Sequence, residues 1–119
     1  MDAGAQGAFE GGDRPGAPAV VLVTAPDLAV GRELARTLVE ERLVACVNLV
    51  PGLTSVYRWE GAVEEASEVL LVMKTVRRRV AELERRVREL HPYDVPEFVV
   101  LAPEHTGARY LAWLIAETA

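Results

Sequence analysis

Two amphipathic helical patterns enclose a long stretch with strand character, and this order restricts the fold more than any other feature. Apolar residues recur at helical spacing over residues 30–40 and again over residues 76–90. Between them, residues 43–59 and 69–74 are continuously apolar or alternate with a period of two. Two strands that follow each other between two helices indicate a split arrangement rather than a simple strand–helix alternation.

Strand patterns on both sides complete the order. Residues 19–24 form a β-branched run, residues 98–102 form another apolar run, and residues 110–115 suit a short amphipathic helix. Glu60-Gly61 is typical of a turn. The chain is therefore predicted to adopt an α+β, ferredoxin-like fold (βαββαβ) with an antiparallel sheet, both main helices on one face, and an extra C-terminal helix.

Helices on one face leave the other face of the sheet uncovered. Val56, Leu70 and Val72 are expected on that face, and a contiguous apolar patch is rarely left in water. The long second and third strands also offer an edge for pairing. We therefore expect the chain to form a homo-oligomer.

Length and composition indicate one domain with a tail. Residues 1–18 are rich in Gly, Ala and Asp, so they bury too little apolar surface to offset the entropy of ordering. We predict a disordered tail over residues 1–18 and a folded domain over residues 19–119.

The net charge and the cysteine content restrict which classes of partner and which cellular compartment are expected. The net charge is -5, which disfavours nucleic acid or an anionic membrane as the main partner. The single thiol, Cys46, allows no intramolecular disulfide and suits a reducing compartment. No secretory signal pattern opens the sequence, so the expected location is cytoplasmic.

The segment from His91 to Phe98 concentrates chemistry in eight residues. It holds the imidazole of His91, the phenol of Tyr93 and the carboxylates of Asp94 and Glu97, and two prolines stiffen it. A rigid loop that carries an imidazole is a candidate binding site. The alternative is a helix end followed by a strand start.

Several segments together closely resemble the CutA family, called divalent cation tolerance proteins. The resemblance covers roughly residues 20–116. The matching segments are Leu43-Val44-Ala45-Cys46-Val47-Asn48, Tyr57-Arg58-Trp59-Glu60-Gly61, Leu71-Val72-Met73-Lys74-Thr75, His91-Pro92-Tyr93-Asp94-Val95-Pro96-Glu97 and Tyr110-Leu111-Ala112-Trp113. The resemblance implies a PII-like homotrimer in the cytoplasm, linked to tolerance of divalent metals, with copper binding often ascribed and no catalysis.

Some positions depart from the family pattern. The copper ligands ascribed in the family include a thiol at the end of the first strand and a histidine pair before the proline. Here Val23 and Leu90 occupy two of these positions, and only His91 remains. Ala62 stands where many members carry a basic residue, which disfavours anion binding on that hairpin.

Three residues are candidate metal ligands. Cys46 and His91 form a soft pair suited to copper and, less well, to zinc, and Glu97 could add a carboxylate. Trimer formation could bring ligands together from different chains, and no cofactor is expected to be obligatory. The alternatives are a buried structural thiol at Cys46 and a strand-end carboxylate at Glu97 paired with a base.

Four further residues are candidates for a ligand cleft. Tyr57 and Trp59 share one face of the hairpin, where they could anchor an interface or line a small-molecule site. Tyr93 belongs to the proline-rich loop. Lys74 needs solvent or a partner, for which Glu97 is a candidate.

Three functions remain open. The first is a non-enzymatic trimer that binds a divalent metal or a small effector between subunits. The second is a very stable scaffolding trimer that acts through a protein partner. The third is an enzyme, but no pattern brings His91, Cys46 and Lys74 together as a base, a nucleophile and an oxyanion site, so we expect no catalysis.

Overall fold

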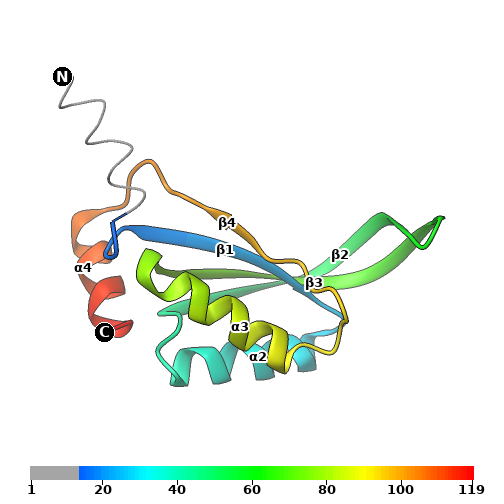
Figure 1. Ribbon diagram of the computed structural model, residues 1–119, viewed down its shortest axis with the longest axis horizontal. Coiled ribbons are helices and arrows are strands. Elements are labelled where there is room, and N and C mark those ends of the chain that lie inside the picture. Colours follow the sequence, from blue (N-terminus) through cyan, green and yellow to red (C-terminus); the bar gives the residue numbers. More distant parts are fainter. Residues whose placement is uncertain (1–13) are drawn as a thin grey trace.

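A four-stranded antiparallel sheet with two helices on one face forms the body of the protein (Figure 1). The computed structural model describes residues 14–119. The strand order is β2-β3-β1-β4. The elements are β1 (Pro18–Ala25), α2 (Leu28–Glu40), β2 (Cys46–Trp59), β3 (Ala62–Val76), a 3-10 turn η1 (Arg77–Arg79), α3 (Val80–Leu90), β4 (Val99–Leu101) and α4 (Ala108–Glu117). The predicted α+β, ferredoxin-like class and the extra C-terminal helix are confirmed.

The core lies between the sheet and helices α2 and α3. The central strands β1 and β3 turn alternate side chains toward the helices, so Val21, Val23, Leu71 and Met73 are fully buried. Leu38 of α2 and further apolar residues of α3 close this layer. The apolar residues that alternate along the strands therefore pack against the apolar residues that recur at helical spacing in α2 and α3.

Local chemistry fixes where the two main helices begin and end. The carboxylate of Asp27 accepts a hydrogen bond from the backbone N–H of Val30 at 2.9 Å, which caps the start of α2. Helix α2 ends before Arg42, which adopts a positive φ of 60°. Helix α3 ends at His91, whose extended backbone follows from the clash that Pro92 would cause with a helical residue.

The β2–β3 hairpin extends beyond the body (Figure 1). Glu60 and Gly61 connect Trp59 to Ala62 with positive φ at both turn positions, as a type I′ hairpin turn requires. A bulge between Val50 and Leu53 inserts one extra residue into β2. The hairpin therefore keeps pairing while its side chains change faces at the bulge.

The bulge corrects one expectation about the uncovered face. Beyond the bulge, Val56 pairs with Glu65 of β3. Glu65 is on the same face of β3 as Val69 and Leu71, which is the face that the helices cover in the body of the protein, so Val56 lies on that face too. The prediction that Val56 shares a face with Leu70 and Val72 is wrong, because Pro51-Gly52, with Gly52 at a positive φ of 83°, forms a bulge that shifts the alternation of side chains in β2. Trp59, which pairs with Ala62, continues the uncovered face instead.

The face of the sheet without helices is apolar along its centre. Leu22 of β1 lies opposite Val72 of β3, and Leu70 lies opposite both Thr24 and Val50. Leu22, Leu70 and Val72 are half-buried within the single chain, whereas Val50 is exposed. The predicted apolar strip on this face is therefore present at Leu70 and Val72.

The C-terminal helix and the first described residues pack at the end of the sheet opposite the hairpin tip. Leu114 of α4 packs with Ala45 and Val76, and the guanidinium groups of Arg78 and Arg79 donate to the carbonyl oxygen of Thr118 at 2.8 and 2.9 Å. Residues 1–13 of the predicted tail lie outside the described residues. Residues 14–17 are held by hydrogen bonds, among them Arg77 N–H to the Ala17 carbonyl, and Pro18 already belongs to β1.

Candidate functional site

The proline-rich loop 91–98 is tied to the end of β1 through His91. The imidazole is buried, and its Nε2 donates to the carbonyl oxygen of Thr24 at 2.7 Å. Its Nδ1 accepts from the backbone N–H of Tyr93 at 3.0 Å. A carbonyl can only accept and an amide N–H can only donate, so these bonds select the neutral ring with its proton on Nε2. Both ring nitrogens are therefore engaged in positioning the loop.

Tyr93 links the loop to the base of the hairpin. Its hydroxyl donates to a carboxylate oxygen of Glu68 at 2.7 Å. Burial, and then the hydrogen bond to the Glu68 carboxylate, raise the pKa of Tyr93 well above its usual range, so the phenol stays protonated. Glu68 is itself 9% exposed, which is unusual for a carboxylate.

A second carboxylate, Glu97, lies near Glu68. Burial of the Glu97 carboxyl, and then the negative charge of Glu68, raise the pKa of Glu97 above its ordinary value of 4.5. Neither carboxylate takes part in an ion pair within residues 14–119. Two neighbouring carboxylates without a counter-charge make this region favourable for a cation.

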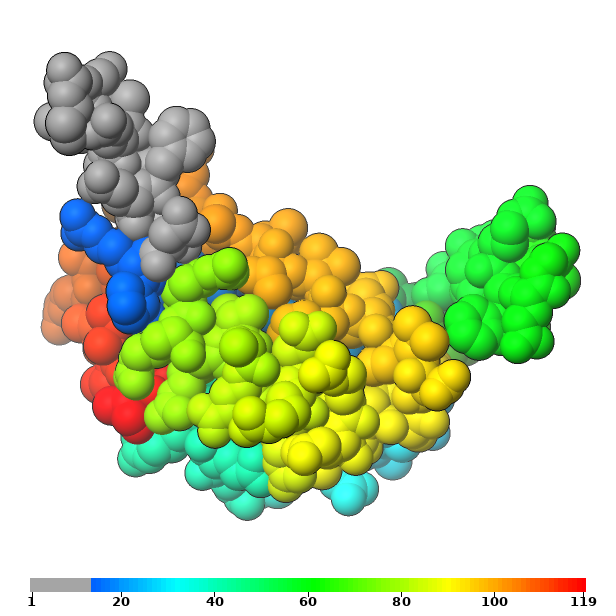
Figure 2. All heavy atoms as spheres, in the orientation of Figure 1, coloured from blue at the N-terminus to red at the C-terminus, as the bar shows by residue number. Residues whose placement is uncertain are grey.

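These groups border a cleft of about 750 Å³ between the hairpin and the loop. Within the described residues, its lining combines three acidic residues, three aromatic residues, two prolines and several smaller side chains. The lining residues are Thr24, Ser55, Val56, Tyr57, Trp59, Glu68, Pro92, Tyr93, Asp94, Val95, Pro96 and Glu97. Figure 2 shows the hairpin as a lobe that projects from the body near the loop.

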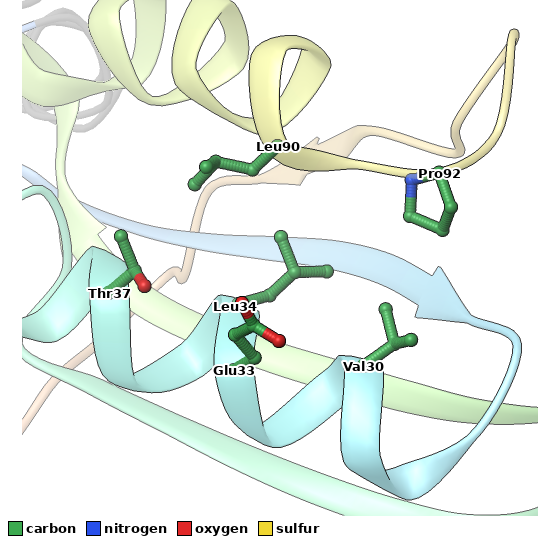
Figure 3. A pocket seen from close by; sticks show the side chains of 6 residues that line it. All are labelled: Val30, Glu33, Leu34, Thr37, Leu90 and Pro92. Carbon is green, nitrogen blue, oxygen red and sulfur yellow. The ribbon is translucent and has the colours of Figure 1, made fainter.

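A smaller groove of about 180 Å³ lies between α2 and the end of α3 (Figure 3). Val30, Leu34, Leu90 and Pro92 give it an apolar wall, and Glu33 is the one charged lining residue in the part of the chain that the structure describes. It lacks the convergent polar groups of a binding site, so the larger cleft is the stronger candidate.

The structure brings together most of the residues selected from the sequence. Tyr57, Trp59, Tyr93 and Glu97 all border the larger cleft, and His91 holds the loop that forms one of its walls. The expected partner of Glu97, a nearby base, is not found among the described ion pairs.

Cys46 and Lys74 lie elsewhere. Cys46 of β2 lies opposite Lys74 of β3. Lys74 is four residues along β3 from Leu70, which lies opposite the cleft residue Thr24. That separation is roughly 13 Å along the strand. The ammonium group of Lys74 donates to the side-chain oxygen of Asn48, so the predicted Lys74–Glu97 pair is wrong: the sequence did not show that the two residues lie at different ends of the sheet.

The three predicted metal ligands do not meet within one chain. Cys46 is half-buried at the start of β2, away from His91 and Glu97, and no cluster of three or more His, Cys, Asp or Glu residues suited to a metal occurs in residues 14–119. A site that combined all three ligands would need more than one chain.

Glu68 is a cleft residue that the sequence did not single out, and Asp94 was noted only as one carboxylate of the proline-rich loop. Glu68 is a buried acid in phase with the apolar residues Leu70 and Val72 of the same strand. The acidic side chain of Glu68 on a strand face that is otherwise apolar could have identified it as a candidate site residue. Asp94 stood within the proline-rich loop but was given no role.

None of the helices in the described part of the chain is long and apolar enough to span a membrane.

Sequence comparison relates the whole folded part of the chain to one family. Residues 19–117 match the CutA1 divalent ion tolerance protein family. The divalent-cation tolerance protein CutA of Thermus thermophilus is 52% identical over 99 residues, which cover 83% of this chain and 96% of the relative. The mouse protein CutA is 46% identical over 100 residues, 84% of this chain but only 56% of the longer mouse protein.

Solved structures agree with this relationship. The Cut A1 structure from Thermus thermophilus superposes with a TM-score of 0.83 at 51% identity and covers 86% of this chain and 99% of that one. CutA1 from Oryza sativa gives 0.83 at 42% identity, with 87% and 95% covered. The names of the two Thermus thermophilus matches describe divalent-cation tolerance. This chain therefore belongs to the CutA1 divalent ion tolerance protein family.

Proposed function

We propose that the protein acts as a homotrimer, without catalysis, and binds a divalent cation or a small effector in clefts between its subunits. The observation that carries the proposal is the pair of carboxylates, Glu68 and Glu97, in a cleft with no basic residue in its described lining. The apolar strip around Leu22, Leu70 and Val72 supports self-association, since sealing it removes apolar surface from water.

The nature of the cation follows from the donor atoms. Oxygen ligands from Glu68 and Glu97 suit hard divalent cations such as Mn²⁺. Copper, and less favourably zinc, would draw on His91 or on Cys46 from another chain. Both nitrogens of His91 are engaged, so copper binding there requires one of these hydrogen bonds to be given up.

Metal titration of the Glu97→Gln variant tests the proposal. We expect the parent chain to take up a divalent cation and the variant to bind about tenfold or more weakly, because one charged ligand is lost. Calorimetry with Mn²⁺, Cu²⁺ and Zn²⁺, together with native mass spectrometry, gives affinity and stoichiometry. Glu40→Gln is the matched control, since Glu40 is an exposed acid of α2 outside the cleft lining. Equal affinity in both variants, or no uptake by the parent, would contradict the proposal.

The affinity for the cation is expected to depend on pH in a definite direction. Because the pKa of Glu97 is raised, a proton competes with the cation at a higher pH than it would at an ordinary carboxylate. Affinity should therefore fall as the pH drops toward and through the raised pKa, within a window above 4.5, and this dependence should flatten in Glu97→Gln.

The compartment is part of the same proposal. A lone, half-buried thiol at Cys46 is compatible with a cytoplasmic location. Relatives from Arabidopsis thaliana and Archaeoglobus fulgidus carry the words chloroplastic and periplasmic in their names. Cell fractionation of the native organism tests the location directly.

A further inference from the structure

The cleft is lined by aromatic rings as well as carboxylates, and this combination suits an organic cation better than a bare metal ion. We propose that the cleft binds an organic ammonium ion, such as an aliphatic amine, between its carboxylates and its aromatic walls. This inference rests on the proposed function, which it narrows from a small effector to a chemical class.

The buried carboxylate of Glu68 is the first observation. The residue is 9% exposed, and within residues 14–119 its carboxylate accepts a hydrogen bond only from the neutral Tyr93 hydroxyl. A largely buried carboxylate is normally paired with a cation, because its lost hydration is otherwise poorly compensated. Within residues 14–119, no ion pair includes Glu68. A bound ammonium group would supply both the positive charge and the missing hydrogen-bond donors.

The aromatic walls are the second observation. Tyr57 and Trp59 line the cleft from the hairpin, and Tyr93 lines it from the loop. Tyr57 and Trp59 are 42% and 43% exposed, so their rings are accessible within the single chain. Aromatic faces attract ammonium groups through cation–π interaction, and they also pack against the alkyl part of an amine. A hydrated metal ion would use the carboxylates but not the rings.

The size and charge of the cleft are the third observation. A volume of about 750 Å³ lies in the range of small-molecule sites, roughly 300–1,000 Å³. Acidic side chains from Glu68, Asp94 and Glu97 line it, and no Lys, Arg or His is among the lining residues in the described part of the chain. The volume of the cleft therefore suits a small organic molecule, and its acidic lining suits a positively charged one.

Calorimetric titration of the full chain with 1,4-diaminobutane tests the inference, and 1,4-butanediol serves as the neutral molecule of the same length. We expect the diamine to bind and the diol not to bind. Glu68→Gln should weaken diamine binding about tenfold or more, because a charged hydrogen bond is lost while the amide oxygen can still accept from Tyr93. Glu40→Gln should bind the diamine like the parent chain.

A second variant guards against a folding defect in Glu68→Gln. Trp59 is exposed near the hairpin tip, so Trp59→Ala should fold and should weaken diamine binding about two- to thirtyfold. In a Trp113→Phe background, Trp59 is the one remaining tryptophan, and its fluorescence should respond to the diamine but not to the diol.

The outcomes separate this inference from the proposed function. If neither amine nor diol binds, or both bind equally, the ammonium inference is overturned. The same holds if neither Glu68→Gln nor Trp59→Ala affects diamine binding. If Mn²⁺ or Cu²⁺ binds in a Glu97-dependent manner while the diamine does not, the inference fails but the proposed function stands. If the diamine binds to a chain that is not a trimer, the ammonium chemistry holds and the inter-subunit cleft of the proposed function fails.

Discussion

Replacing Val72 with glutamate is expected to separate the proposed trimer into single chains that remain folded. Val72 lies in the central strand β3, opposite Leu22 and Asn48, on the face that no helix covers. In a trimer that seals this face, the new carboxylate would be withdrawn from water without a partner. Such a group costs several kcal/mol, and a symmetric trimer would contain three of them.

Sedimentation of Val72→Glu measures this effect. The expected result is a shift of the main species from three chain masses to one, with the far-ultraviolet circular dichroism of the parent retained. Val39→Glu is the matched control, because Val39 is a partly exposed valine of α2 and should leave the assembly intact. A Val72→Glu protein that stays trimeric with unchanged thermal stability would show that this face is not the subunit interface.

Replacing Leu71 with alanine is expected to weaken the fold itself. Leu71 is the neighbour of Val72 but points to the opposite face, where it is fully buried. A Cβ atom added at Gly31 of α2 would lie 3.5 Å from Leu71, which shows how closely the helix approaches this side chain. Truncation removes apolar contacts and leaves a cavity, at a cost of about 2–5 kcal/mol.

Denaturant unfolding measures the loss for Leu71→Ala. A domain of this size is typically stable by about 5–15 kcal/mol, so the midpoint should fall markedly. Val39→Ala removes apolar atoms from an exposed site and should change stability by no more than about 0.5 kcal/mol. Similar unfolding midpoints for the two variants would contradict the assignment of Leu71 to the core.

The fold was predictable because its signals are local and repeated. The three-and-four spacing of Val80, Leu83 and Val87 predicts α3, and the β-branched run before Pro26 predicts β1. Pro92 predicts the end of α3 from sterics alone. Each of these depends on residues that are close in the sequence.

The site was predictable only in part, because its geometry depends on long-range register. Tyr57, Trp59 and Tyr93, predicted as cleft residues, and Glu97, predicted as a metal ligand, border one cleft, whereas Lys74 and Cys46 do not. The bulge after Val50 decides the face of every later residue in β2. Pro51-Gly52 marks an interruption of the strand there, but not how many residues the bulge adds.

The engagement of both His91 nitrogens and the burial of Glu68 depend on partners that are distant along the chain. The Nε2 bond of His91 reaches Thr24 of β1, and the carboxylate of Glu68 meets Tyr93 across the cleft. A sequence pattern shows which donors and acceptors are available but not which of them pair.

The assembly state of the parent chain is the most direct test of the central claim, that copies of this sheet seal one another and place the cleft of each chain between subunits. Native mass spectrometry at micromolar concentration should give three times the chain mass of 13.0 kDa. A folded species with the mass of one chain would contradict the claim, since the apolar strip would then face water and no cleft could lie between subunits.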